Sequence, residues 1–252
     1  MFSTQHTSFR EGARRFVETQ IAPYVGEWEE SGGIPRVLFE RMAAAGLLGL
    51  THDPAIGGHG LDFGYDVVLA EELPRCRAMG VSLSVLAQTN IFPPLLARLG
   101  TDEQKARFLA PAIRGRSVGC VASSEPAGGS DVVRAVNTTA TSDGDCWIIS
   151  GEKLYITNSP IADFVVALVR TREERTINSL SLVIVPTETS GFAVKKTLEK
   201  LGMHSSPTGW LAFDGCRVPK SLTLGKVNMG YHYVARNILE ERLLGGAAAV
   251  AA

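Results

Sequence analysis

The stretch Ala122-Ser123-Ser124-Glu125-Pro126-Ala127-Gly128-Gly129-Ser130-Asp131 carries the strongest local signal in this chain. Its adjacent glycines have no side chains, so the backbone there can approach a ligand closely. Ser124 and Ser130 add hydroxyl groups that donate or accept hydrogen bonds. We interpret the segment as a candidate binding loop, although a segment of this composition taken alone is more often an ordinary turn.

A second candidate segment follows at Gly151-Glu152-Lys153-Leu154-Tyr155-Ile156-Thr157-Asn158. Residues two apart lie on one face of a strand, because successive side chains point to opposite faces. Tyr155 and Thr157 are thus predicted to present an aromatic ring and a hydroxyl group to one planar ligand. Taken alone, this pattern too is more often a strand end than a cofactor site.

Both segments belong to a region, from Ser117 to Leu224, that alternates short β-favouring runs with turns. The runs are rich in Val, Ile and Leu, and turn residues such as Asp143-Gly144-Asp145 separate them. Many short strands with frequent turn signals favour a small barrel or sandwich over a parallel doubly wound sheet. We therefore predict a middle β-barrel domain over residues 117–226.

The flanking regions are predicted to be helical. Apolar residues recur at helical spacing through residues 1–116. The first helical stretch is Phe9–Tyr24, and Pro23 is expected to mark the end of its helix. A last helix is expected over Gly230–Ala252, and its end, Leu243–Ala252, is apolar on nearly every side, which is typical of a helix buried against neighbours. The chain supplies no later helix to cover it. We therefore expect an N-terminal helical domain at 1–116 and, at 227–252, the first helix of an incomplete C-terminal helical domain.

Composition limits the classes of function. The chain has 252 residues, is 45% hydrophobic and 20% charged, and carries a formal net charge of −1. This balance is typical of a globular protein and gives no basic field for nucleic acid or an anionic membrane. The four cysteines show no paired spacing and the five histidines are scattered, so no metal site is expected. The N-terminus lacks the layout of a signal peptide, and we expect a cytoplasmic protein.

Ordered motifs across essentially the whole chain resemble the acyl-CoA dehydrogenase family. The matching segments are Glu27-Trp28-Glu29, residues 45–50, residues 57–60, Glu71-Glu72-Leu73, residues 124–131, residues 154–158, residues 200–203, residues 213–219 and Leu224-Gly225. The resemblance implies an α+β fold with an N-terminal helical domain, a middle β-barrel domain and a C-terminal helical bundle. On this interpretation the chain is C-terminally truncated.

The resemblance also implies FAD as cofactor. Ser124 falls where the family places a hydroxyl group against the pyrimidine side of the flavin. Thr157 falls where a threonine hydroxyl meets flavin N5, the atom that receives hydride. Tyr155 falls where an aromatic residue, often Trp, packs on the flavin, so its smaller ring is a mild departure. Ser130 falls near the path of the substrate's pantetheine arm.

The implied reaction removes a proton from the carbon α to a thioester, which requires a carboxylate within hydrogen-bond reach. Some family members, including isovaleryl-CoA and long-chain dehydrogenases, carry this base on the first C-terminal-domain helix, immediately before an arginine. The segment Leu239-Glu240-Glu241-Arg242-Leu243-Leu244 resembles that arrangement. Glu241 is therefore the candidate base and Arg242 its neighbour on the substrate side. In the simpler interpretation, Glu240 and Glu241 are solvated helix charges paired with Arg236 and Arg242.

Two functions remain open at this stage. The first is FAD-dependent α,β-dehydrogenation of an acyl thioester, either acyl-CoA or an acyl group on a carrier protein, by a homo-oligomer that passes electrons to electron-transfer flavoprotein. The second is a catalytically incomplete chain. Such a chain would be half of a split dehydrogenase or a non-redox interaction subunit, and it would need a complementary C-terminal chain.

Overall fold

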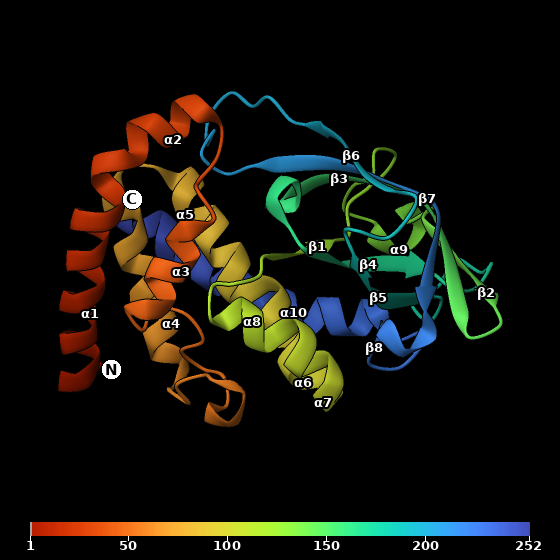
Figure 1. The fold of residues 1–252 in the computed structure, drawn as a ribbon, viewed down its shortest axis with the longest axis horizontal. Helices are drawn as coiled ribbons and strands as arrows, with labels where there is room; N and C mark the ends of the chain where they lie inside the picture. The colour runs from red at the N-terminus through yellow and green to blue at the C-terminus, as the bar shows by residue number, and fades with distance from the viewer. Residues whose placement is uncertain (1) are drawn as a thin grey trace.

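The computed structural model describes residues 2–252 and shows helices at one end and a β-sheet at the other (Figure 1). Short π-helical and 3₁₀ turns join several of the helices into longer rods. The helical N-terminal part of the predicted fold is therefore confirmed. Its helices are α1 (Thr4–Phe16), α2 (Val25–Ser31), α3 (Val37–Ala44), α4 (Phe63–Glu72), α5 (Met79–Leu86), α6 (Phe92–Leu99), α7 (Asp102–Gln104) and α8 (Ala110–Ile113).

The first helix differs from the prediction at both ends. It begins at Thr4, where the Ser3 side chain and the His6 side chain cap each other's backbone N–H groups. The α-helix ends at Phe16, but the helical path does not stop at Pro23: it continues through a π-helical turn (Val17–Ile21) and a 3₁₀ turn (Ala22–Tyr24) directly into α2. Proline is tolerated at the start of a helical turn, since its missing N–H has no partner to lose there. Pro23 therefore marks a change of helix type, and the predicted end is wrong.

The β-strands form one mixed sheet in the order β6-β7-β3-β2-β4-β5-β8, with β1 paired to β4. Most neighbours are antiparallel, but β1 and β2 each pair with β4 in parallel. The exclusion of a doubly wound parallel sheet is correct, while the sheet found is mixed and its path ends at β6 and β8. The elements are β1 (Gly119–Ala122), α9 (Val132–Ala135), β2 (Thr139–Asp143), β3 (Cys146–Thr157), β4 (Phe164–Arg170), β5 (Leu180–Pro186), β6 (Phe192–Thr197), β7 (Thr208–Pro219) and β8 (Thr223–Leu224).

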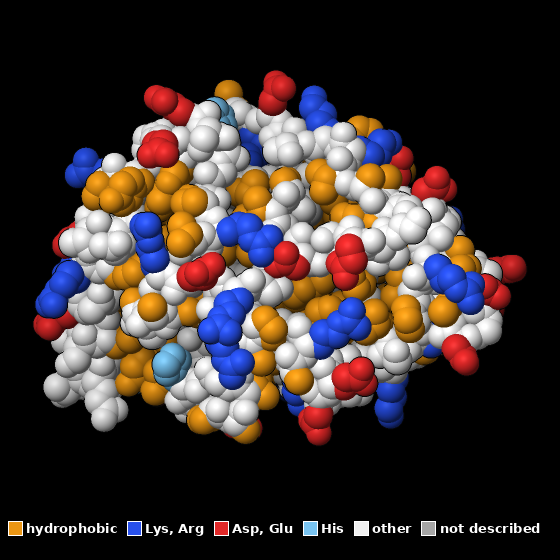
Figure 2. Space-filling view, viewed as in Figure 1, with side chains coloured by type: hydrophobic (Ala, Val, Ile, Leu, Met, Phe, Trp, Pro, Cys, Tyr) orange, Lys and Arg blue, Asp and Glu red, His pale blue; other side chains and the backbone are white. Residues whose placement is uncertain are grey.

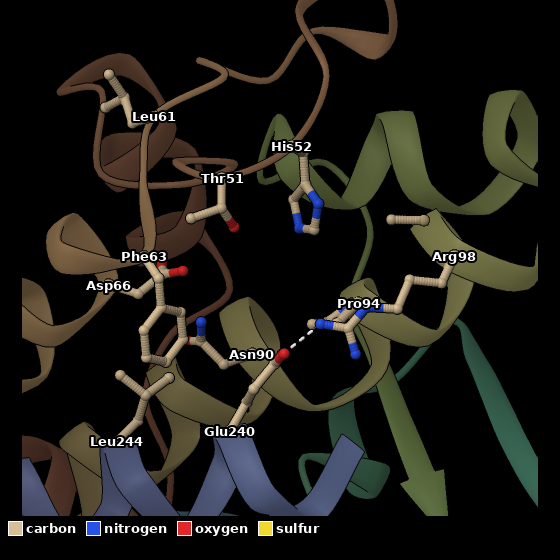
Figure 3. A pocket seen from close by; sticks show the side chains of 11 residues that line it. Thr51, His52, Leu61, Phe63, Asp66, Asn90, Pro94, Arg98, Glu240 and Leu244 are labelled. Atoms are coloured by element: carbon tan, nitrogen blue, oxygen red, sulfur yellow. Dashed lines mark hydrogen bonds and ion pairs between the residues drawn. The ribbon is translucent and has the colours of Figure 1, made fainter. Parts of the chain in front are cut away.

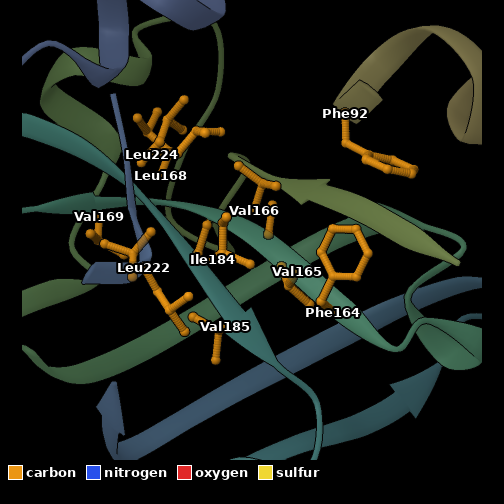
Figure 4. Packing of buried hydrophobic residues seen from close by; sticks show 14 of the residues in the cluster. Phe92, Phe164, Val165, Val166, Leu168, Val169, Ile184, Val185, Leu222 and Leu224 are labelled. Atoms are coloured by element: carbon orange, nitrogen blue, oxygen red, sulfur yellow. The ribbon is translucent and has the colours of Figure 1, made fainter. Parts of the chain in front are cut away.

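The sheet core is apolar and joins the helical part directly. Strands β4 and β5 are buried along their whole length. Figure 4 shows Val166 and Ile184 among the side chains of the hydrophobic core that packs on the sheet. Phe164 at the start of β4 meets Phe92 of α6 edge to face, with ring centroids 5.3 Å apart. This contact fixes α6 against the sheet, because tightly packed aromatic rings resist displacement.

An ion pair buried inside the sheet domain holds both candidate segments. Lys153 is completely buried, and its Nζ donates to Glu125 Oε1 at 2.8 Å, to the Leu168 carbonyl at 2.6 Å and to the Ser123 carbonyl at 3.3 Å. Burial lowers the pKa of Lys153 to about 8, although the charge of Glu125 acts against this. The Glu125 carboxylate also accepts from the backbone N–H of Asn137. The binding loop is thereby tied to β3 and β4.

The last helix, α10 (Gly230–Ala251), packs on the N-terminal helices. Leu244 and Ala248 are buried in the same hydrophobic cluster as residues of α1 and α4. Earlier helices of this chain therefore cover one face of α10, because α4, α5 and α6 lie against it. The other face is open, with Leu239 70% and Val250 92% exposed.

The helical rod Met79–Leu99 is long and apolar enough to cross a membrane by length and composition alone. Most of its apolar stretch, 72%, is buried inside the structure. Packing within the protein thus accounts for its apolar character. On the face shown in Figure 2, basic and acidic side chains are interspersed, in keeping with the small net charge.

We expect Lys153→Met to destabilise the protein by about 3–5 kcal/mol, because it leaves the buried Glu125 carboxylate without its counter-charge. Urea unfolding followed by circular dichroism measures this loss. The double variant Glu125→Gln/Lys153→Met removes both charges and should recover part of the stability. An unchanged urea midpoint for Lys153→Met would contradict the importance of the pair.

Candidate active site

A cavity of about 490 Å³ lies between the sheet and α10. It collects every residue for which the sequence predicted a site role, although they come from widely separated segments. The structure brings them together, while the function of each stays a prediction. The predicted residues in the cavity wall are Ser124, Ser130, Tyr155, Thr157, Glu241 and Arg242.

The backbone of β3 at Tyr155 and Thr157 differs from the regular strand that was predicted. Lys153 pairs with Leu211 of β7 and Ile156 pairs with Gly209, so β3 contains one extra residue, a β-bulge. Tyr155 has φ +64°, in the left-handed region. The bulge interrupts the regular alternation of side chains along β3. The prediction that Tyr155 and Thr157 share a face because they lie two residues apart on a regular strand is therefore wrong. Both side chains still line the cavity, and the Tyr155 ring is 68% exposed.

The binding loop is held at its N-terminal half. The Leu154 N–H donates to the Ser124 carbonyl at 2.9 Å, which fixes this exposed serine beside β3. The neighbouring Ser123 Oγ is buried, lines the cavity and has no hydrogen-bond partner among residues 2–252. A buried hydroxyl without a partner is costly unless a ligand or water supplies one.

The loop leads into a capped helical turn, α9, which begins directly after Asp131. Asp131 accepts from the Arg134 N–H at 3.2 Å and so caps it. A Cβ at Gly128 would lie 2.8 Å from Ala135 Cβ, whereas a Cβ at Gly129 would meet nothing within 4 Å. Packing against α9 therefore requires glycine at position 128. The sequence analysis had explained this glycine by the close approach of a ligand.

Glu241 is a half-buried carboxylate without a partner. No ion pair or hydrogen bond of its side chain is found within residues 2–252, and burial raises its pKa while the charge of Arg242 partly offsets this. Glu240 instead pairs with Arg98 of α6. The pairing of the two glutamates with Arg236 and Arg242 is thus not what the structure shows. An unpaired carboxylate with a raised pKa in a cavity has the properties of a proton acceptor.

Several cavity residues escaped the sequence analysis. Ile238, Val234 and Tyr231 lie about one, two and three turns before Glu241 on the same side of α10. Their helical spacing from Glu241 would have revealed them. Buried Asn237 donates to the Ile91 carbonyl at 2.9 Å. This bond holds α10 against the helical rod Met79–Leu99, which also lines the cavity. No local pattern in the sequence indicates that contact.

The arrangement suits a planar, hydrogen-bonding ligand. The Tyr155 ring faces solvent beside the cavity, and the hydroxyl groups of Ser123, Ser124 and Thr157 lie along its wall. Opposite them, α10 contributes the Glu241 carboxylate. Among residues 2–252 no group of three or more His, Cys, Asp or Glu side chains is placed to hold a metal ion. The residues present therefore fit a flavin ring.

Comparison with known proteins agrees with this geometry. The chain matches the acyl-CoA dehydrogenase N-terminal domain over residues 3–116 and the middle domain over residues 120–216. It is 36% identical to the long-chain specific acyl-CoA dehydrogenase of rat mitochondria over 97% of this chain and 56% of that protein. The chain thus spans just over half the length of this relative.

Solved structures give the same result. An acyl-CoA dehydrogenase of Geobacillus kaustophilus superposes with a TM-score of 0.93 at 34% identity, covering 99% of this chain and 66% of that one. A glutaryl-CoA dehydrogenase of Mycobacterium smegmatis, solved in complex with FADH2, has a TM-score of 0.91 at 27% identity, covering 99% of this chain and 62% of that one. From its N-terminal and middle domains, the chain belongs to the acyl-CoA dehydrogenase family.

Proposed function

We propose that this chain carries the flavin and substrate site of an enzyme that dehydrogenates an acyl thioester between its α and β carbons. The observation that carries the proposal is the position of Glu241, an unpaired carboxylate in the cavity that also contains Tyr155 and Thr157. A base, an exposed aromatic ring and hydroxyl groups around one cavity are the parts that this reaction needs.

Glu241 takes the proton from the carbon α to the thioester carbonyl. Burial favours the protonated form of the carboxyl group, so the ionised carboxylate is a stronger base than an exposed glutamate. The walls beside it are apolar, with Ile91 on the helical rod and Ile238 on α10. These side chains exclude water from the proton transfer and hold the acyl chain in line.

FAD is the cofactor that we propose for the cavity. Ser124 and Thr157 would hold the ring by hydrogen bonds, with Tyr155 packed against it. When bound, the flavin supplies the acceptor for the hydride that leaves the β carbon. Support comes from the relative solved with FADH2 and from the unpartnered Ser123 hydroxyl in the cavity wall.

The substrate that we propose is an acyl-CoA, or an acyl group on a carrier protein. Ser130 and Arg242 are exposed in the cavity wall, where the polar arm of such a substrate would lie. The names of the relatives support CoA thioesters. We further propose electron-transfer flavoprotein as electron acceptor, a homo-oligomeric cytoplasmic protein, and domain limits at residues 1–116, 117–226 and 227–252.

The second candidate is a chain that acts only together with a complementary C-terminal chain. The open face of α10 favours it, because Leu239 and Leu243 are 70% and 58% exposed and Val250 is 92% exposed. Large apolar side chains exposed together on one helix are typical of a contact surface. The two candidates differ in whether this chain binds flavin and turns over alone.

The absorbance spectrum of the purified chain separates the two candidates. We expect a flavin band in one-to-one ratio with protein, which bleaches when an acyl-CoA is added, because all the predicted site residues lie around one preformed cavity. Colourless protein that gains flavin only when mixed with a complementary chain would support the second candidate and contradict the first.

Glu241→Gln should keep the flavin but slow its reduction by acyl-CoA roughly 100- to 10,000-fold, since the amide cannot accept the α proton. Stopped-flow absorbance measures the rate at saturating substrate. The matched control is Glu40→Gln, the same change at an exposed position of α3 that does not line the cavity. Reduction of Glu241→Gln at the control rate would rule out Glu241 as the base.

The rate of flavin reduction should fall as pH drops through the pKa of Glu241, because only the ionised carboxylate accepts a proton. Since burial raises this pKa above the usual 4.5, the fall should begin at a higher pH than for an exposed glutamate. Arg242→Gln removes the charge that lowers the pKa, so the acid limb should move to still higher pH. A limb that stays in place in this variant would show that Glu241 is not the titrating group.

A further inference from the structure

A second cavity, of about 390 Å³, lies on the other side of α10 (Figure 3). Glu240 and Leu244 form its α10 wall, and Glu240 lies nearly half a helical turn away from Ile238 of the candidate active site. The remaining wall comes from α4, α6 and the loop that follows α3. The proposed dehydrogenation uses none of its residues, so this cavity has no assigned role.

Asp66 is the unusual residue in this cavity. It is only 4% exposed, and Figure 3 shows its carboxylate facing the space between Thr51 and Asn90. Burial raises its pKa to about 6 and the charge of Glu240 acts in the same direction, although hydrogen bonding by Asn90 and Thr51 acts against this. No ion pair of Asp66 is found in the part of the chain that the structure describes. Above this pKa the ionised carboxylate has hydrogen bonds but no counter-charge among the described residues, and a bound cation would supply one.

The neighbouring basic groups do not supply that cation. His52 is 7% exposed, and burial together with the charge of Arg98 lowers its pKa to about 4, so it is neutral near neutral pH. The Arg98 guanidinium pairs with Glu240 across the rim, as the dashed line in Figure 3 marks. The charge of Asp66 is therefore available to a positively charged ligand.

The rest of the wall suits an alkyl group. Phe63, Pro94, Ala97 and Leu244 contribute apolar side chains to the lining that also contains Asp66. A ligand that combines one cationic end with a short hydrocarbon chain would neutralise Asp66 and bury its carbons against these side chains.

The loop that forms the floor is held in place by its own backbone. Gly60 N–H donates to the His52 carbonyl at 2.8 Å, and His59 N–H donates to the Gly49 carbonyl at 2.9 Å. A Cβ at Gly58 would lie 2.2 Å from the His52 carbonyl oxygen, so only glycine permits this packing. The cavity is therefore preformed, and a ligand would lose little affinity to ordering the loop.

We propose that this cavity binds a primary alkylammonium ion, with the ammonium group on Asp66 and the alkyl chain against Phe63 and Leu244. Three N–H donors of the ammonium match the Asp66 carboxylate and the Thr51 hydroxyl oxygen. The proposal concerns a ligand other than the acyl thioester and does not depend on flavin binding.

Saturation-transfer NMR and calorimetry with n-butylammonium chloride test the proposal on the whole chain. We expect saturable binding at pH 8, at least tenfold weaker binding to Asp66→Asn, and unchanged binding to Asp145→Asn. The last is the same chemical change at an exposed position outside the cavity. Affinity should also fall below pH 6, because protonated Asp66 has no charge to offer the cation.

Two further measurements separate charge from shape. Butan-1-ol has the same alkyl chain without the charge, and it should bind wild type and Asp66→Asn equally weakly. Ala97→Leu fills part of the cavity and should weaken n-butylammonium binding while Asp66 stays in place. Absence of saturable n-butylammonium binding, or equal affinity for wild type and Asp66→Asn, would overturn the proposal.

Discussion

The ion pair between Lys153 and Glu125 is the interaction on which the candidate active site depends. A lysine that is completely buried is tolerated only because a carboxylate and two carbonyls surround its ammonium group. The same contacts join the binding loop, β3 and β4. Ser124 lies next to one partner, and Tyr155 lies two residues after the other. The residues proposed to meet the flavin are thus placed by a charge pair inside the sheet.

Helix α10 separates two cavities of different chemistry. Glu241 faces the candidate active site and stays unpaired, whereas adjacent Glu240 faces the other cavity and is bound by Arg98. Consecutive residues on a helix are about 100° apart, so one short acidic pair serves both sides. The bond from Asn237 to the Ile91 carbonyl and the burial of Leu244 fix the rotation of the helix. A small rotation of α10 would therefore disturb both cavities together.

Much of the fold was predictable from the sequence because it follows local rules. The helices and the apolar strands β4 and β5 are encoded in spacing and composition. The mixed pairing of the sheet was not predictable, since parallel contacts of β1 and β2 with β4 join distant segments. The end of the first helix was misplaced because Pro23 sits at the start of a turn, where proline is harmless.

The site residues were predicted from the ordered motifs of the family resemblance more than from the local properties of each segment. The resemblance named the residues that line the cavity, but the local reason offered for Tyr155 and Thr157 failed because a bulge intervenes. The positive φ of Tyr155 disfavours a residue with a Cβ by about 1–3 kcal/mol. Asparagine or glycine would fit that backbone with less strain, yet neither offers an aromatic ring. Position 155 therefore accepts backbone strain to place the aromatic ring that we propose to contact the flavin, and selection for heat resistance alone would remove the ring.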